Sequence, residues 1–107
     1  MSSETDNDLV FKALASPIRR QMLDFLKGQP QTTGAVAARF PDLSRFAVMQ
    51  HLGVLAEADL VIVQRKGRER WNHLNPLPIK HIQDRWIGPL AERAVGLLDA
   101  MKRDLEG

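Results

Sequence analysis

The sequence contains no cysteine. This absence excludes disulfides, iron–sulfur clusters, thiolate zinc sites and cysteine nucleophiles together. It fits a reducing cytosol, and we expect a cytoplasmic protein. No apolar run approaches the ~20 residues that a membrane-spanning helix needs, and the first ten residues, MSSETDNDLV, are polar and acidic, unlike a signal peptide. We therefore expect no membrane partner.

The residue sets that enzymes need are missing as well. The chain has no phosphate-binding glycine loop, no catalytic pair of carboxylates and no nucleophile–base set. Histidine, the residue type most often used for proton transfer near neutral pH, occurs only at His51, His73 and His81. His81 and Asp84 share one face of a predicted helix, but a zinc site needs three or four ligands. We expect no enzyme activity, no metal and no cofactor.

The charge that is present is unevenly distributed. The 107 residues carry a net charge of +2. Residues 1–11 contain three acidic residues, residues 12–80 contain eleven Lys and Arg against five Asp and Glu, and residues 81–107 contain four against five. A basic middle between acidic ends is typical of a chain that meets a polyanion, although a mixed solvated surface gives similar counts.

The apolar pattern predicts a mainly α (α+β) domain with one β-hairpin. Residues 1–7 lack apolar anchors and are expected to form a disordered tail, and residues 8–107 are expected to form a single domain. Four helices are predicted before the hairpin: from Asp8, from Ser16-Pro17 to Gly28, from Thr32 or Thr33 to Phe40, and over 44–58. The hairpin pairs 61–66 with 68–74 around Gly67. A long helix follows over 78–106, and Gly88-Pro89 should kink or break it.

Two helices joined by a short turn and followed by a hairpin have the order of a winged helix-turn-helix, in which the second helix enters the DNA major groove. Val48, Leu52 and Leu55 form the inward stripe of helix 44–58, so its N-terminal end presents Ser44, Arg45, Met49 and Gln50 outward. Arginine can address guanine and glutamine can address adenine. The alternative is that these are ordinary solvent-facing residues.

The hairpin turn is the second cationic feature. Residues 65–70 contain four cations and one anion. A hairpin this short exposes its tip, and exposed cations beside a reading helix would contact phosphates or the minor groove. Protection of an edge strand from aggregation explains the same charges and is compatible with DNA contact.

The segments LASPIRRQMLDFL and LSRFAVMQHLGVLAEADLVIVQRKGRERWNHLNP resemble the ArsR-type (arsenic-repressor-like) bacterial transcriptional regulators. The resemblance implies a homodimeric winged-helix repressor that reads operator DNA with helix 44–58 and holds the DNA with a basic wing at 65–70. The expected partners are double-stranded DNA and a second copy of the chain. The expected DNA-contacting residues are Thr33, Ser44, Arg45, Phe46, Met49, Gln50, His51, Arg65, Lys66, Arg68 and Arg70.

Four positions depart from the pattern of the family. Many members have proline near Phe46, serine at Met49, a basic residue at Gly53 and glycine at Asp59. Met49 cannot donate a hydrogen bond, so it can touch only a thymine methyl group or a sugar. Gly53 removes a phosphate contact, whereas Asp59 tolerates the left-handed conformation nearly as glycine does. The fold is expected to survive these changes, but the operator sequence cannot be transferred from relatives.

The terminal helix carries more apolar side chains than the winged body can cover. Pairing with the same helix of a second chain, and with residues near the N-terminus, would bury them. The expected dimer contacts are Leu9, Val10, Trp86, Leu90, Leu97, Leu98, Met101 and Leu105. Two alternatives stay open at this point: an adaptor that binds another protein, and a sensor with a pocket for a small-molecule inducer between the terminal helices, lined by Trp86 and Met101.

Overall fold

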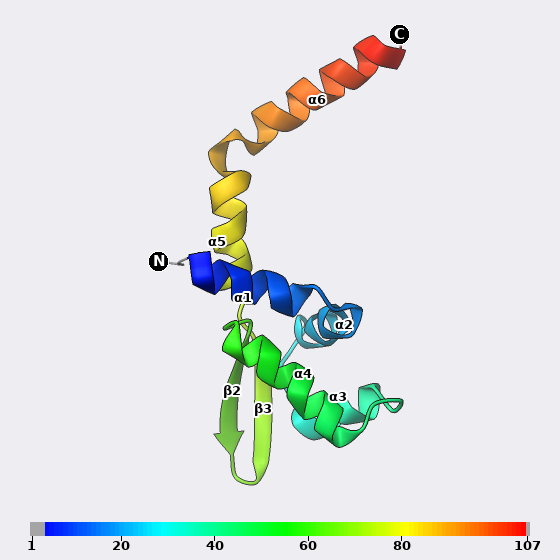
Figure 1. Cartoon of the computed structure of the whole chain (residues 1–107), viewed down its shortest axis with the longest axis vertical. Helices are drawn as coiled ribbons and strands as arrows, with labels where there is room; N and C mark the ends of the chain where they lie inside the picture. Colours follow the sequence, from blue (N-terminus) through cyan, green and yellow to red (C-terminus); the bar gives the residue numbers. More distant parts are fainter. Residues whose placement is uncertain (1–3, 107) are drawn as a thin grey trace.

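The computed structural model describes residues 4–106 and contains helices, a 3₁₀ turn and a small sheet (Figure 1). The elements follow in the order α1 (Glu4–Leu14), α2 (Pro17–Leu26), β1 (Gln31–Thr32), α3 (Thr33–Arg39), α4 (Arg45–Glu57), β2 (Val61–Lys66), β3 (Glu69–Leu74), α5 (Leu77–Trp86), η1 (Gly88–Leu90) and α6 (Ala91–Glu106). This is the predicted winged helix-turn-helix: α3 and α4 form the helix-turn-helix, and β2 and β3 form the wing.

The helix starts are set by side-chain caps at the predicted positions. The hydroxyl of Ser16 accepts a hydrogen bond from the backbone N–H of Arg19 at 3.3 Å, and Thr32 and Ser44 accept from the residues three positions later at 3.0 Å each. Each hydroxyl satisfies a backbone donor that has no partner within its helix. Helix α4 ends at Glu57, and Asp59 two residues later adopts a positive φ of 62°, the left-handed conformation that aspartate was expected to tolerate.

The first helix begins earlier than expected. Helix α1 starts at Glu4, so the prediction of a disordered tail is wrong for residues 4–7, and residues 1–3 lie outside the described residues. Asn7 is buried, and acidic side chains occupy the first turn. Their negative charges interact favourably with the positive end of the helix dipole. Residues 4–7 contain no large apolar side chain, so their sequence gives no periodic signal for a helix.

The sheet has three strands instead of the two expected. Strand β1 pairs antiparallel with β3, and the strand order is β1-β3-β2. Gln31 lies opposite Asn72, so the short strand joins the start of α3 to the root of the wing. A two-residue strand leaves almost no pattern in a sequence. Its effect is to fix the wing relative to the helix-turn-helix.

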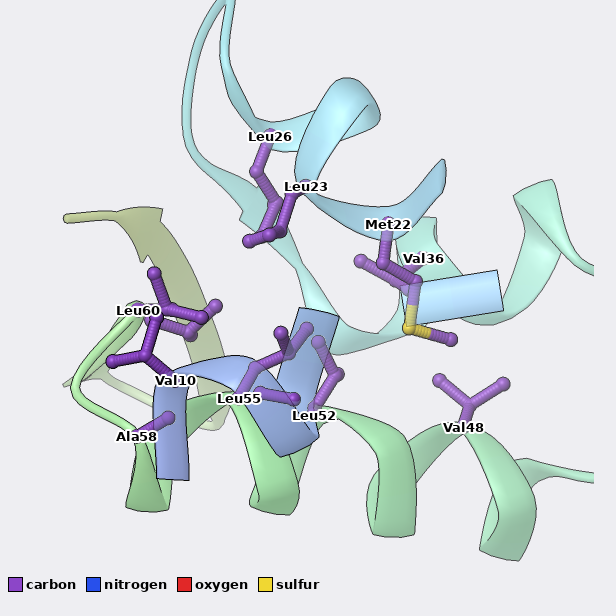
Figure 2. Packing of buried hydrophobic residues seen from close by; sticks show 12 residues of the cluster. Val10, Met22, Leu23, Leu26, Val36, Val48, Leu52, Leu55, Ala58 and Leu60 are labelled. Atoms are coloured by element: carbon purple, nitrogen blue, oxygen red, sulfur yellow. The ribbon is translucent and has the colours of Figure 1, made fainter. Parts of the chain in front are cut away.

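The core lies where α1, α2 and α3 meet α4 (Figure 2). The stripe predicted for α4, Val48, Leu52 and Leu55, is buried and points toward Val10 of α1 and Met22 of α2. The corner between α1 and α2 is held by arginine. Arg19 donates from Nε to the carbonyl of Ala13 at 2.8 Å and from Nη2 to the carbonyl of Lys12 at 3.0 Å, capping carbonyls at the end of α1.

The C-terminal part breaks at the predicted place. Gly88 has a φ of +45°, and η1 separates α5 from α6. Helix α6 runs away from the body at the end opposite the wing (Figure 1). The radius of gyration is 17.7 Å, whereas a compact chain of this length has about 13 Å. No helix within residues 4–106 combines the length and hydrophobicity needed to cross a bilayer.

Candidate nucleic-acid interface

Three elements meet around one surface hollow at the wing end of the molecule. The hollow has a volume of about 310 Å³. Its lining comes from the start of α3, the start of α4 and the wing: Thr32, Thr33, Gly34, Arg45, Met49, Arg68, Glu69 and Arg70. Three arginines from two separate elements therefore face one concave surface that contains one acid. Such a surface attracts a polyanion.

The N-terminal half of α4 and its cap present five of the eleven residues predicted to contact DNA. Ser44, Arg45, Phe46, Met49 and Gln50 are all exposed, and Phe46 is 71% exposed. The free backbone N–H groups of the first turn and the helix dipole add partial positive charge at this end. The structure thus brings this predicted group together on one helix end beside the wing.

The wing itself carries a repulsive pair. Arg65 and Arg70 are directly opposite each other in the β2–β3 register, whereas Lys66 lies opposite Glu69. Like charges at opposed positions destabilise a hairpin. The turn closes through Gly67, which has a φ of +63°, and Arg68 is exposed beside it. An arginine pair that costs stability in the free chain becomes favourable when an anion lies between or beside the two guanidinium groups.

Two residues predicted to contact DNA are directed elsewhere. Thr33 is 5% exposed, and its hydroxyl accepts a hydrogen bond from Asn72 Nδ2 at 3.1 Å, so its side chain supports the surface from below. His51 is half-buried on the side of α4 that faces α2, and its Nδ1 lies 3.2 Å from Arg19 Nη1. Because arginine only donates, this contact requires neutral His51 with the proton on Nε2.

The environment of His51 favours that neutral form. Burial, and then the nearby charge of Arg19, lower the pKa of His51 from its ordinary value of 6.5. The imidazole therefore acts as an internal acceptor that joins α4 to the α1–α2 corner. The resemblance implies a place for His51 on or beside the DNA-reading surface, but successive residues in a helix point 100° apart, and the ring of His51 turns toward Arg19.

Asn72 is a supporting residue that is not among the predicted site residues. It is 1% exposed, and its Nδ2 donates to the carbonyl of Gln31 and to the hydroxyl of Thr33, both at 3.1 Å. These two bonds tie β3 to the start of α3. A polar residue at an inward position of a strand was the available signal, because buried amides in proteins are almost always hydrogen-bonded.

The predicted dimer residues separate into two groups. Val10 is 3% exposed within the core and Leu9 is half-buried, so the expectation of Val10 at a subunit surface is wrong. The remaining side chains are all more than half exposed: Trp86, Leu90, Leu97, Leu98, Met101 and Leu105. Trp86 contacts Phe11 of α1, with ring centroids 6.0 Å apart, whereas α6 points away from α5 (Figure 1).

A second hollow, of about 290 Å³, lies between α1, the end of α4 and the start of α5. Its lining includes Leu9, Glu57, Leu77 and His81, but neither Trp86 nor Met101. This hollow is therefore a different place from the pocket considered between the terminal helices. Asp84, the partner considered for His81 in a metal site, forms an ion pair with Lys80 at 3.1 Å. Residues 4–106 contain no group of three potential metal ligands.

Comparison with known proteins agrees with this geometry. A family described as a helix-turn-helix domain matches residues 14–64. The transcriptional repressor SdpR of Bacillus subtilis (strain 168) is 39% identical over 62% of this chain and 72% of its own length. YuzN of the same strain, an uncharacterized HTH-type transcriptional regulator, is 33% identical over 77% of this chain and 96% of its own.

A solved structure extends the match over most of the chain. The crystal structure of an ArsR family transcriptional regulator superposes with a TM-score of 0.72 at 26% sequence identity, covering 87% of this chain and 91% of that one. The relatives and the fold are those of DNA-binding regulators and not of enzymes. The chain belongs to the ArsR family of winged helix-turn-helix transcriptional regulators.

Proposed function

We propose that the chain is a homodimeric transcriptional repressor that reads operator DNA with α4 and grips the backbone with its wing. In each subunit the N-terminal half of α4 enters a major groove, where Arg45 and Gln50 contact base edges. Arg65, Lys66, Arg68 and Arg70 contact phosphates or the adjacent minor groove. A dimer would present two reading helices to successive major grooves, about 34 Å apart.

The observation that carries the proposal is the shared hollow between α4 and the wing. Arg45 comes from the helix and Arg68 and Arg70 come from the hairpin, yet all three line the same surface. A base-reading helix needs phosphate contacts that fix its register on the duplex. The hydrogen bonds of Asn72 support this arrangement, because they hold the wing against α3 before any DNA arrives.

The proposal of a dimer rests on the apolar side chains outside the core. Leu97 is 67% exposed, and Leu90, Leu98, Met101 and Leu105 are similarly open to water. Burying one such side chain fully is worth ~1.5–3 kcal/mol. Five of them together therefore represent on the order of ten kcal/mol, which is comparable to the stability of a whole domain. A second copy of the chain is a partner that is always present.

The proposal that the chain represses transcription is supported by its similarity to SdpR. SdpR is named a transcriptional repressor, and a dimer bound across two major grooves blocks access of other proteins to that DNA.

The test separates base reading from phosphate binding. The full chain is first used to select its preferred duplex from a random library. Arg45→Ala and Gln50→Ala are each expected to cost roughly 1–3 kcal/mol on that duplex and to reduce discrimination against mismatched sites. Arg68→Ala with Arg70→Ala should weaken binding to all sequences by similar factors and flatten the salt dependence by about 0.9 per lost phosphate contact.

A matched control removes the same charge far from the hollow. Lys102→Ala with Arg103→Ala on α6 lowers the net charge equally and should leave the salt slope unchanged. If the arginine variants of the wing keep the wild-type slope, the wing is not part of the interface. If Arg45→Ala and Gln50→Ala both keep full specificity, α4 is not the reading helix, and binding of another protein becomes the better explanation of this surface.

A further inference from the structure

Two large apolar side chains lie on the exposed face of α4 where polar base-reading residues would be expected. Phe46 is 71% exposed and Met49 is 37% exposed, and neither belongs to the core cluster. They are three positions apart and are therefore neighbours on the helix surface. The stability of the fold does not explain them, because an exposed aromatic ring contributes little to it.

The surroundings of the pair point to a polyanion with an apolar group in its groove. Met49 lines the hollow together with Arg45, Arg68 and Arg70. The next turn of the same face carries Gly53, where an added Cβ would meet no atom within 4 Å. Gln50 and Arg45 are thus the hydrogen-bonding side chains of this face beyond the capping Ser44. A protein partner with an apolar surface would gain nothing from the surrounding arginines.

Duplex DNA offers one apolar group on the floor of the major groove, the C5-methyl group of thymine. We propose that Phe46 and Met49 recognise thymine methyl groups and so specify thymine at two positions of each half-site. This inference rests on the proposed function, because it requires α4 in the major groove. To the proposed function it adds that thymine is the base recognised at the two positions of α4 whose side chains cannot form a hydrogen bond.

The experiment removes the methyl group and nothing else. In the selected duplex, each thymine is replaced in turn by deoxyuridine, which keeps the base pair and every hydrogen-bonding atom. Binding of the full-length chain to each duplex is measured at fixed salt. We expect about a fourfold loss of affinity at each of two positions per half-site, the effect of one lost methyl contact, and no loss elsewhere.

Protein variants assign each methyl group to its side chain. Phe46→Ala should bind the thymine and deoxyuridine duplexes equally at one of the two positions, and Met49→Ala should do so at the other. Both side chains are exposed, so both variants should fold. Ile62→Ala is the matched control, because Ile62 is a half-exposed apolar residue on β2 outside the hollow. This variant should keep the wild-type discrimination at both positions.

The outcomes distinguish this inference from the function on which it rests. If Arg45→Ala abolishes specificity but every deoxyuridine duplex binds like the parent, the chain reads DNA and the methyl inference is wrong. If Phe46→Ala weakens binding while the thymine preference persists, the ring acts through sugar or phosphate contacts and the inference is again wrong. If the chain prefers no duplex over random DNA, the proposed function itself fails.

Discussion

Helices α4 and α6 carry the same kind of apolar stripe but meet opposite environments. In α4, Val48 and Leu55 are completely buried against α1, α2 and α3. In α6, Leu97 is 67% exposed and Leu105 is 86% exposed, and the helix leaves the body altogether (Figure 1). The apolar periodicity of a helix therefore predicts only that one of its faces is buried. Whether the same chain buries that face depends on the direction in which the connecting segments lead the helix.

The largest expected effect tests whether α6 is covered by a second subunit. Leu97→Asp with Met101→Asp places two charges on the stripe, and burying them would cost several kcal/mol each. We expect sedimentation to change from a dimer to the 12.1 kDa monomer. Affinity for a palindromic operator should fall by about 10³-fold or more, toward non-specific binding, because one reading helix is lost.

A control variant makes the same change in net charge as the double substitution, but outside the apolar stripe of α6. Arg103→Asp changes the net charge by the same amount, and residue 103 lies 200° around the helix from Met101. This variant should remain dimeric. A wild-type chain that sediments as a monomer and still binds a palindrome tightly would contradict the dimer, and with it the spacing of the half-sites.

The second prediction compares matched truncations in the two stripes. Leu55→Ala should lower the free energy of unfolding by about 2–5 kcal/mol, because it opens a cavity in the core. Leu98→Ala should cost less than about 0.5 kcal/mol at dilutions where the chain is monomeric, as expected for a surface position. Urea unfolding at two protein concentrations measures both effects. At high concentration the cost of Leu98→Ala should rise, whereas the cost of Leu55→Ala should stay constant.

The same contrast explains how far the sequence could predict the structure. The caps at Ser16 and Ser44 and the positive φ at Asp59 follow from local chemistry, so they were predictable. The burial of Thr33 and the inward direction of His51 depend on Asn72 and Arg19, which are 39 and 32 residues away. Such partners leave no periodic signal, because each is a single polar residue among many.

The third prediction concerns the contact between α4 and the α1–α2 corner. The pKa of His51 is lowered in the folded chain, so the unfolded chain binds a proton more readily. The stabilising contribution is complete above pH 6.5, the ordinary histidine value, and declines as the pH falls toward the folded pKa. Protonated His51 cannot accept from Arg19 and repels its charge.

Urea unfolding across pH 5 to 8 measures this decline. His51→Asn keeps an acceptor near the position of Nδ1 and does not titrate in this range. The difference in the free energy of unfolding between wild type and variant should narrow below pH 6.5, because the two proteins differ only at residue 51. A difference that is constant with pH would show that the contact between His51 and Arg19 does not contribute to stability.

The smallest expected effect is at Gly53, the one glycine inside α4. An added Cβ there meets nothing within 4 Å, and glycine in a helix interior costs roughly 0.5–1 kcal/mol relative to alanine. Gly53→Ala should therefore raise the free energy of unfolding by about that amount. Gly53→Lys should stabilise the helix similarly and, in addition, supply a cation that can contact a phosphate.

Comparing the two variants separates helix propensity from charge. Both should raise the melting temperature of the free chain, but Gly53→Lys alone should steepen the salt dependence of DNA binding, by about 0.9 for one added phosphate contact. If Gly53→Ala instead weakens binding to the selected duplex while stabilising the fold, the backbone at residue 53 lies against the DNA, since a methyl group is then enough to disturb the fit. In that case the absence of a side chain at residue 53 allows close contact with the DNA, and α4 lies in the groove along a greater length than its first two turns.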